Sequence, residues 1–209
     1  MQSKDRINDC VVQIATVNGT GSSSANTLLM KAIFRMGIPV IGKNYFPSNI
    51  QGLPTWYEIR VTGEGYLARS SKVDIMVAMN AQTYAEDLAS VVTNGVLIYD
   101  SSWPRAELED RSDITVLPVP LSKMCNESFT GARARILMKN IAYVGAIAAL
   151  IEIDRDVVRQ LLSETFVDKP NLVDSNMQAF ELGYDYSQAE FNCPLESRLV
   201  PMDAMTNHI

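Results

Sequence analysis

Short apolar segments that alternate with helical patterns constrain the fold of this chain most strongly. Residues 10–16, 73–79 and 96–99 favour strands, and the first two are followed by helical patterns at about 25–36 and 81–92. Strands joined in this way by a helix make right-handed crossovers in a parallel sheet. The pattern therefore predicts an α/β domain.

A β-hairpin is expected to interrupt this alternation. Residues 55–61 alternate in polarity, Gly63-Glu64-Gly65 forms a turn, and residues 66–69 return as the second arm. A short strand limited by proline is also expected at 114–119. With these elements the predicted architecture is a three-layer, Rossmann-like α/β domain with a mainly parallel sheet and a β-hairpin insertion.

The last part of the chain is predicted to be helical. Residues 132–151 carry small and apolar side chains on almost every face, so we expect this helix to be buried by its own sheet or by a partner chain. Further helices are expected at about 154–166 and 169–186. Residues 187–209 lack periodicity and are expected to connect toward a further domain, which leaves residues 1–186 as the folded unit.

A glycine loop lies between the first strand and its helix. Gly19 and Gly21 supply part of a dinucleotide-binding pattern, but Ser24 stands in place of the third glycine and Lys43 in place of the ribose-binding acid. These departures argue against a nicotinamide or flavin dinucleotide. A serine-rich helix N-terminus still suits a phosphate or carboxylate, which makes both glycines and Ser22 candidate ligands. The alternative is that the glycines only permit a tight turn.

The segment 42–56 is predicted to be a functional loop. Its two glycines, two prolines and many amide and hydroxyl side chains favour neither helix nor strand, although it lies between two predicted strands. Binding groups concentrate on loops that a rigid scaffold holds in place. Tyr45, Phe46 and Trp56 are unusual in so polar a loop, and they either contact ligand or pack the loop onto the domain.

Composition excludes several function classes. The net charge of −6 argues against a nucleic-acid partner. Cys10, Cys125 and Cys193 are far apart in sequence, so we expect free thiols in a reducing compartment and no iron–sulfur or zinc site. His208 is the single histidine, which argues against a histidine triad. The longest apolar run, 141–151, is shorter than the roughly 20 residues that span a bilayer. We expect a soluble, cytoplasmic protein without a membrane partner.

Several stretches match one known family. They are Asn18–Asn26, Phe34–Pro39, Gly42–Trp56, Ile59–Arg60, Lys139–Ala146 and Asp168–Pro170. Together they resemble the gamma domain of 2-oxoacid:ferredoxin oxidoreductases, most of all the N-terminal part of the 2-oxoglutarate:ferredoxin oxidoreductase alpha subunit. The resemblance covers roughly residues 10–185, and the central loop is its specific part. The family often has Arg-Gly-Gly where this chain has Ile50-Gln51-Gly52, which leaves the ligand of Gln51 open.

The resemblance implies a reaction and a set of partners. A 2-oxoacid, 2-oxoglutarate in the first instance, is decarboxylated with thiamine diphosphate, the acyl group passes to coenzyme A, and electrons leave through [4Fe-4S] clusters to ferredoxin. This domain would help to bind coenzyme A and cover the active site, without catalytic or metal-binding residues of its own. The remaining alpha-subunit domains and a beta subunit would carry thiamine diphosphate, Mg²⁺ and the clusters.

Two alternatives stay open at this point. One is the same role in a pyruvate, branched-chain or aryl 2-oxoacid enzyme. The other is a free-standing module that binds an anion or nucleotide through the glycine loop. If the chain is a subunit of either kind of oxidoreductase, we expect an exposed apolar surface on the small-residue helix and a chain that behaves poorly when isolated from its partners. If it is a free-standing module, we expect a stable monomer.

The central loop contains groups suited to coenzyme A, a polyanion with a long hydrogen-bonding arm. The candidate ligands are Lys43, Asn44, Ser48, Asn49, Gln51, Gly52 and Arg60. Lys43 is a point charge for a phosphate or carboxylate, and the amides and the hydroxyl are neutral donors and acceptors. Gly52 permits close backbone approach. For Arg60 the alternative is an ion pair with Glu58 or Glu64 on an exposed face of the sheet.

Overall fold

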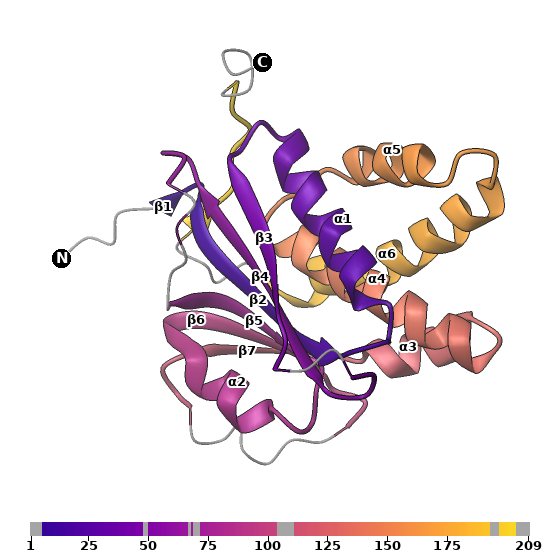
Figure 1. Cartoon of the computed structure of the whole chain (residues 1–209), viewed down its shortest axis with the longest axis horizontal. Helices are drawn as coiled ribbons and strands as arrows, with labels where there is room; N and C mark the ends of the chain where they lie inside the picture. Colours follow the sequence, from indigo (N-terminus) through magenta and orange to yellow (C-terminus); the bar gives the residue numbers. More distant parts are fainter. Residues whose placement is uncertain are drawn as a thin grey trace.

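A six-stranded sheet in the order β3-β4-β2-β5-β6-β7 forms the centre of the protein (Figure 1). The computed structural model describes residues 6–47, 50–66, 68, 72–103, 111–192 and 197–203. The strands are β2 (Asp9–Val17), β3 (Val40–Tyr45), β4 (Pro54–Thr62), β5 (Val73–Ala78), β6 (Val91–Asp100) and β7 (Thr115–Val119). β2, β5, β6 and β7 are mutually parallel, whereas β4 runs antiparallel to β2 and β3. The predicted α/β class and mainly parallel sheet are confirmed.

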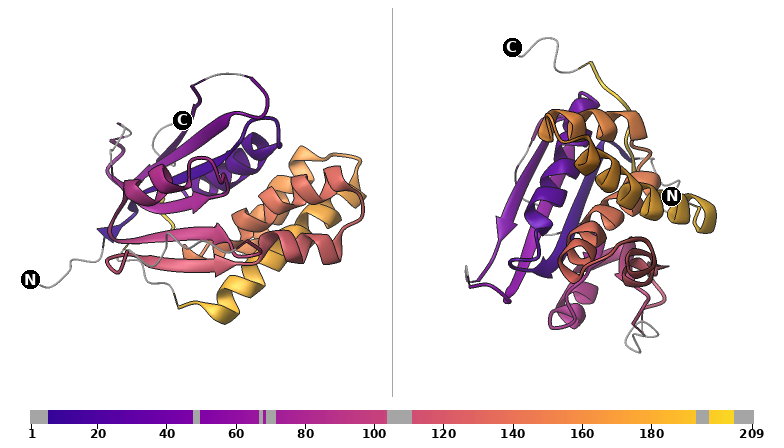
Figure 2. Two further views of the ribbon diagram at one scale, coloured as in Figure 1. Left: turned by 90° about the horizontal axis from the view of Figure 1, so that it is seen from below. Right: turned by 90° about the vertical axis from the view of Figure 1, so that its right-hand side faces the viewer.

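Helices cover both faces of this sheet. One layer contains α1 (Ser22–Arg35), α3 (Leu121–Ser128), α4 (Ala132–Leu150), α5 (Arg155–Thr165) and α6 (Pro170–Glu190). α2 (Tyr84–Ser90) packs on the opposite face, apart from the other helices (Figure 2). The side chains of β5 alternate between two separate cores: Ile75 and Val77 pack in the core under α1 and α4, and Met76 packs in the core under α2. The three layers predicted from sequence are present.

The β-hairpin is present, but its arms differ from those predicted. β3 pairs with β4 from Val40 opposite Val61 to Tyr45 opposite Trp56. Residues 42–45 and Pro54, expected in a loop, therefore belong to strands, and Thr55 and Trp56 lie in β4 as the alternation of 55–61 predicts. Residues 66–69 were expected as an arm, yet Tyr66 and Ala68 are not in a strand, and the other two lie outside the described residues. Polar residues are tolerated in β3 because it is an edge strand with one face toward solvent.

Helix α4 is buried inside the domain by α6. A Cβ atom added at Gly145 would overlap the carbonyl oxygen of Phe180, and one added at Gly183 would overlap that of Ala142. The two glycines thus let the helix backbones approach each other closely. From Asn140 to Leu150 nearly every residue of α4 is buried. In the described residues, the exposed apolar surface that the subunit interpretation expected on this helix is therefore limited to its N-terminal half, where Ile136 is 41% exposed.

Residues 187–192 and 197–203 include regular structure that the sequence does not predict. α6 runs to Glu190, and β8 (Ser197–Arg198) pairs in parallel with β1 (Arg6–Ile7). The side-chain amide of Asn8 donates to the Val200 carbonyl, and its oxygen accepts from the Val200 amide, at 2.9 and 2.8 Å. These bonds satisfy the backbone groups of Val200, in a segment whose sequence shows no periodicity that would predict a hydrogen-bond partner. The role of residues 187–209 as a connector toward another domain stays a prediction.

Alanine at Gly145 or Gly183 should destabilise the protein. Glycine to alanine in a helix interior normally stabilises by about 1 kcal/mol. Here the added methyl group meets the backbone of the facing helix, so we expect a loss of roughly 2 kcal/mol or more in the free energy of unfolding. Chemical denaturation measures this, with exposed Gln178→Ala in α6 as the control. A gain in stability for either glycine variant would contradict the close helix contact.

The stability should also depend on pH through Asp87 of α2. Burial raises the pKa of this carboxyl from 3.8 to about 6, although Trp56 and Thr83 donate hydrogen bonds to it. The unfolded chain then loses the proton first as pH rises, so stability falls between about pH 4 and pH 6 and stays lower above it. Relative to Asp87→Asn, the wild type should lose about 2 kcal/mol over that interval. Parallel unfolding profiles for the two proteins would contradict this assignment.

Candidate functional site

The glycine loop forms the start of a pocket at the carboxyl end of β2. Gly19 and Gly21 have φ angles of +89° and +83°, which residues with a Cβ rarely adopt. The Thr16 and Ser22 hydroxyls hydrogen-bond at 2.9 Å and join the strand to the first turn of α1. The helix thus begins at Ser22, three residues before the predicted start. This arrangement places the first turn of α1 beside the carboxyl end of β2.

Asn18 ties the glycine loop to the loop that follows β3. Its amide donates to the Leu53 carbonyl at 2.8 Å, and its carbonyl accepts from the Gly52 amide at 3.0 Å. Its side chain donates to the Ile50 carbonyl at 3.1 Å. Gln51 packs directly on Gly19, where an added Cβ would lie 2.6 Å from the Gln51 Cγ. The structure therefore brings together the two loops that the sequence singles out.

A pocket of about 380 Å³ lies between these loops, α1 and the hairpin. It is lined by Asn18, Gly19, Gly21, Ser22, Ser23, Asn44, Phe46 and Thr55. None of these lining residues is acidic. The α1 first turn also lacks an acidic residue, and its N-cap, Gly21, has no side chain that could accept a hydrogen bond from the first amides. The positive end of the helix dipole is thus free to face the pocket, which suits an anionic or strongly polar ligand.

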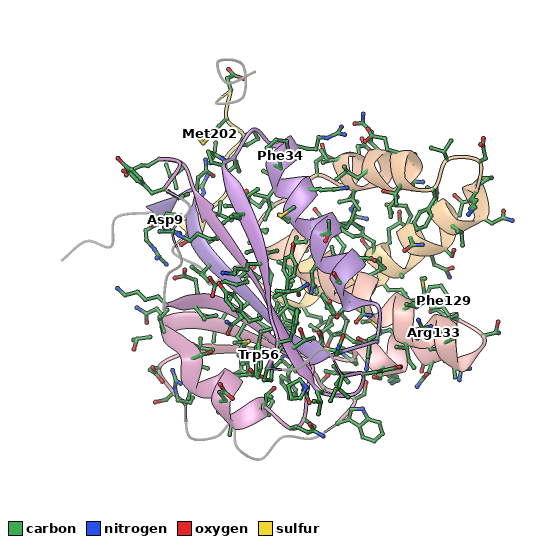
Figure 3. The ribbon with its side chains drawn as sticks, viewed as in Figure 1. Asp9, Phe34, Trp56, Phe129, Arg133 and Met202 are labelled. Atoms are coloured by element: carbon green, nitrogen blue, oxygen red, sulfur yellow. The ribbon has the colours of Figure 1, made fainter. Side chains whose placement is uncertain are left out.

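Two residues of α4 hold the outer side of the glycine loop. Asn140 donates to the Thr20 carbonyl at 2.9 Å, and Arg133 donates to the Gly19 carbonyl at 3.4 Å. Figure 3 labels Arg133 in the first turn of α4. The guanidinium adds a positive charge beside the loop. Neither residue was predicted from the sequence, because the sequence of α4 does not indicate which of its faces contacts the glycine loop.

The structure places the predicted ligands in three groups. Gly19, Gly21, Ser22 and Asn44 line the pocket. Gln51 and Gly52 lie beside it, one against Gly19 and the other bonded to Asn18. Ser48 and Asn49 lie outside the described residues, so their roles stay predictions. Phe46, for which ligand contact was one of two alternatives, also lines the pocket. Ser23 and Thr55 were not predicted as ligands, although the alternation of β4 places Thr55 on the same face as buried Tyr57.

Lys43 and Arg60 are not part of this pocket. Lys43 lies on the other face of β3, opposite Glu58, with its ammonium 5.3 Å from the centroid of the Tyr45 ring. Arg60 lies near the far end of β4 and forms an ion pair of 2.5 Å with Asp9, not with either predicted glutamate. Lys43 points away from the pocket because successive side chains of a strand lie on opposite faces and Asn44 faces the pocket. Arg60 is distant from it because β4 is long and Arg60 lies near its other end. Neither cation therefore lines the pocket beside the glycine loop.

The polar residue at the end of β6 is satisfied by hydrogen bonds within the protein. Asp100, at the end of β6, accepts hydrogen bonds from the backbone amides of Ser102 and Ser122 and from the Ser122 hydroxyl. Lys139 of α4 lies 3.8 Å from the same carboxylate. Asp100 is therefore a satisfied residue of a strand-end turn, and we leave it outside the pocket.

The described residues show neither a metal cluster nor a helix suited to a membrane. Over residues 6–47, 50–66, 68, 72–103, 111–192 and 197–203, no three histidine, cysteine or acidic side chains gather as metal ligands. In the same ranges no helix combines the length and apolar character needed to cross a bilayer. Cys10 and Cys125 are buried free thiols, and burial raises the pKa of both.

Relatives of known sequence are subunits of oxidoreductases. The 2-oxoacid:ferredoxin oxidoreductase 2 subunit alpha of Aeropyrum pernix is 22% identical over 230 residues, which cover 92% of this chain and 36% of that protein. The ketoisovalerate oxidoreductase subunit VorA of Methanothermobacter marburgensis is 26% identical over 115 residues, 55% of this chain and 23% of that protein. The chain therefore spans about a third of the first relative and less of the second.

Solved structures show the same fold. The 2-oxoglutarate:ferredoxin oxidoreductase of Magnetococcus marinus matches 94% of this chain, and 34% of its own chain, with a TM-score of 0.83 and 22% identity. A pyruvate oxidoreductase subunit of Thermotoga maritima matches 85% of this chain and 96% of its own, with a TM-score of 0.69 and 15% identity. A keto/oxoacid ferredoxin oxidoreductase gamma subunit of Geobacter sulfurreducens covers 86% and 99%, with a TM-score of 0.67 and 16% identity.

These matches confirm the resemblance found in the sequence. A model of one protein family, described as pyruvate ferredoxin/flavodoxin oxidoreductase, matches residues 11–186. That range includes the glycine loop, the hairpin and the buried helix pair. The chain belongs to the pyruvate ferredoxin/flavodoxin oxidoreductase family.

Proposed function

We propose that this chain is a component of a 2-oxoacid:ferredoxin oxidoreductase, and that its glycine-loop pocket binds part of coenzyme A. The observation that carries the proposal is the pocket of Asn18, Ser23 and Asn44 beside an uncapped helix N-terminus without acidic lining residues. The Magnetococcus marinus enzyme, whose N-terminal part supports the fold, is described with 2-oxoglutarate, coenzyme A and succinyl-CoA bound.

The pocket residues fit one end of coenzyme A. A volume of about 380 Å³ is near the lower limit for small-molecule sites, so the pocket suits part of the molecule and the rest extends over the surface. Backbone amides of the α1 first turn and the Ser23 hydroxyl are donors for a phosphate, while the Asn44 amide suits the pantetheine arm. Phe46, which is 53% exposed, offers an apolar surface beside them.

The chemistry divides between this chain and its partners. Bound coenzyme A supplies the thiol that takes the acyl group. The residues of this chain bind and orient it, and the loop after β3 limits the access of water to the pocket. In the overall reaction 2-oxoglutarate and coenzyme A give succinyl-CoA, CO₂ and one proton, and two electrons pass to oxidised ferredoxin. We assign thiamine diphosphate, Mg²⁺ and [4Fe-4S] clusters to other domains or subunits, so the chain is inactive alone. We place the assembled enzyme in the cytoplasm.

A branched-chain 2-oxoacid is the second candidate substrate. Its support is the similarity to a ketoisovalerate oxidoreductase subunit, which is 26% identical over 55% of this chain. The pocket described above does not discriminate between oxoacids, because it faces the common co-substrate. Rates of ferredoxin reduction by the assembled enzyme with 2-oxoglutarate, pyruvate, 2-oxoisovalerate and aryl 2-oxoacids would select among them.

A negative charge at Ser23 should weaken coenzyme A binding without harming the fold. Glutamate in the first turn of a helix is favourable by about 0.3–1 kcal/mol, so Ser23→Glu should unfold no more easily than the wild type. The same charge repels a phosphate in the pocket, and we expect KM for coenzyme A to rise about tenfold, equivalent to about 1.4 kcal/mol. The measurement is steady-state kinetics of the assembled enzyme with coenzyme A varied.

Two controls define the result. Ser23→Gln has the same size without the charge and should change KM for coenzyme A much less. Lys43→Ala removes a cation on the other face of β3 and should leave KM unchanged, with thiamine content equal in all variants. If KM for coenzyme A is the same in Ser23→Glu and the wild type, the pocket does not bind the co-substrate.

A further inference from the structure

The back of the hairpin is attached to α2 by a buried carboxylate. The indole Nε1 of Trp56 donates to Asp87 Oδ1 at 2.7 Å, and the Thr83 hydroxyl donates to Asp87 Oδ2 at 2.8 Å. Asp87 is 1% exposed. Figure 3 labels Trp56 on the side of the sheet near α2. A buried carboxylate with both oxygens hydrogen-bonded fixes the groups that donate to it.

The strand alternation places Trp56 directly behind the pocket wall. Across the sheet, Tyr45, Trp56 and Ala15 form one row of paired residues, and this row faces α2. The next residue of β4, Thr55, pairs with Thr16 and points to the opposite face, where it lines the glycine-loop pocket. A shift of Trp56 therefore moves the wall of the pocket.

The hydrogen bond to Asp87 is a large part of what holds the indole in place. A hollow of about 160 Å³ lies next to it, lined by Gln13, Tyr45, Trp56, Glu86, Asp87 and Ser90. Space of this size leaves the indole without packing contacts on one side. β3 is also an edge strand, paired to β4 alone. β4 itself is fixed by its pairing with β2 along its whole length, and the Trp56–Asp87 bond adds the contact that ties this edge of the sheet to α2.

We propose that Trp56 and Asp87 are positioning residues for coenzyme A: they hold the β3–β4 hairpin so that Asn44 and Thr55 face the N-terminus of α1. Neither residue touches the co-substrate. The inference rests on the proposed function, because it assigns a role to the wall of that same pocket. It also explains why a tryptophan stands in so polar a segment, since its indole N–H donates to Asp87 and an aliphatic side chain has no such donor.

The test compares variants of the assembled enzyme. Trp56→Phe keeps most of the ring and removes the N–H donor, and Asp87→Leu removes both acceptors. We expect each to raise KM for coenzyme A roughly five- to tenfold while kcat at saturating coenzyme A and thiamine content stay within about twofold. Because the two residues act through one bond, the double variant should be no worse than the poorer single variant.

A matched control separates positioning from loss of stability. Leu88→Ala removes a buried side chain of α2 that packs in the same core and does not bond to Trp56. It should lower Tm at least as much as Trp56→Phe and leave KM for coenzyme A unchanged. Amide hydrogen exchange in residues 44–46 and 55–57 should accelerate in Trp56→Phe and stay slow in Leu88→Ala.

The outcomes distinguish this inference from the proposed function. An unchanged KM for coenzyme A in Trp56→Phe, alongside a raised KM in Ser23→Glu, overturns the positioning role and leaves the pocket assignment intact. An equal rise of KM in Leu88→Ala also overturns it, because general loosening of α2 then explains the effect. If Ser23→Glu has no effect, the pocket assignment itself fails. Should Asp87→Leu not assemble, Trp56→Phe alone decides.

Discussion

The pocket depends on the hydrogen bonds of Asn18. Its amide, carbonyl and side chain bond to three residues of the loop after β3, so two segments far apart in the chain are fixed against each other. Each bond contributes about 1 kcal/mol, which is modest for stability but sufficient to select one arrangement of a polar loop. Gln51 can lie on Gly19 only because that position has no Cβ. The glycine is needed for loop contact as well as for its backbone conformation.

The layers and most strands could be predicted from sequence because they depend on local patterns. Buried apolar runs indicated β2, β5 and β6, and the small residues of α4 indicated a buried helix. Asp154 caps α5 through the Asp156 amide as expected, since N-cap chemistry is local. α3 was not predicted, because its eight residues are few and only Leu121 and Cys125 are buried. The partner of α4 is α6, which no local pattern specifies.

The site was predictable in part. Gly19, Gly21 and Ser22 follow from the link between a glycine loop and a helix N-terminus. The positions of the other pocket residues could not be predicted because the β3–β4 hairpin was not recognised. The glycine and the polar residues of β3 suggested a loop, whereas this segment pairs with β4 and is a strand. Once β3 is a strand, alternation sends Lys43 away from the pocket and keeps Asn44 in it. The registers of β3 with β4 and of β4 with β2 therefore decide which predicted ligands are brought together, and a single sequence does not reveal them.

Binding of coenzyme A at the glycine-loop pocket can be tested by amide hydrogen exchange of the assembled enzyme with and without coenzyme A. This measurement reads each segment separately and requires no substitution. The account predicts slower exchange on addition of coenzyme A in peptides that cover residues 18–24 and 44–46, with residues 58–62 at the far end of β4 unchanged. Unchanged exchange in residues 18–24 at saturating coenzyme A would contradict the assignment of the glycine-loop pocket.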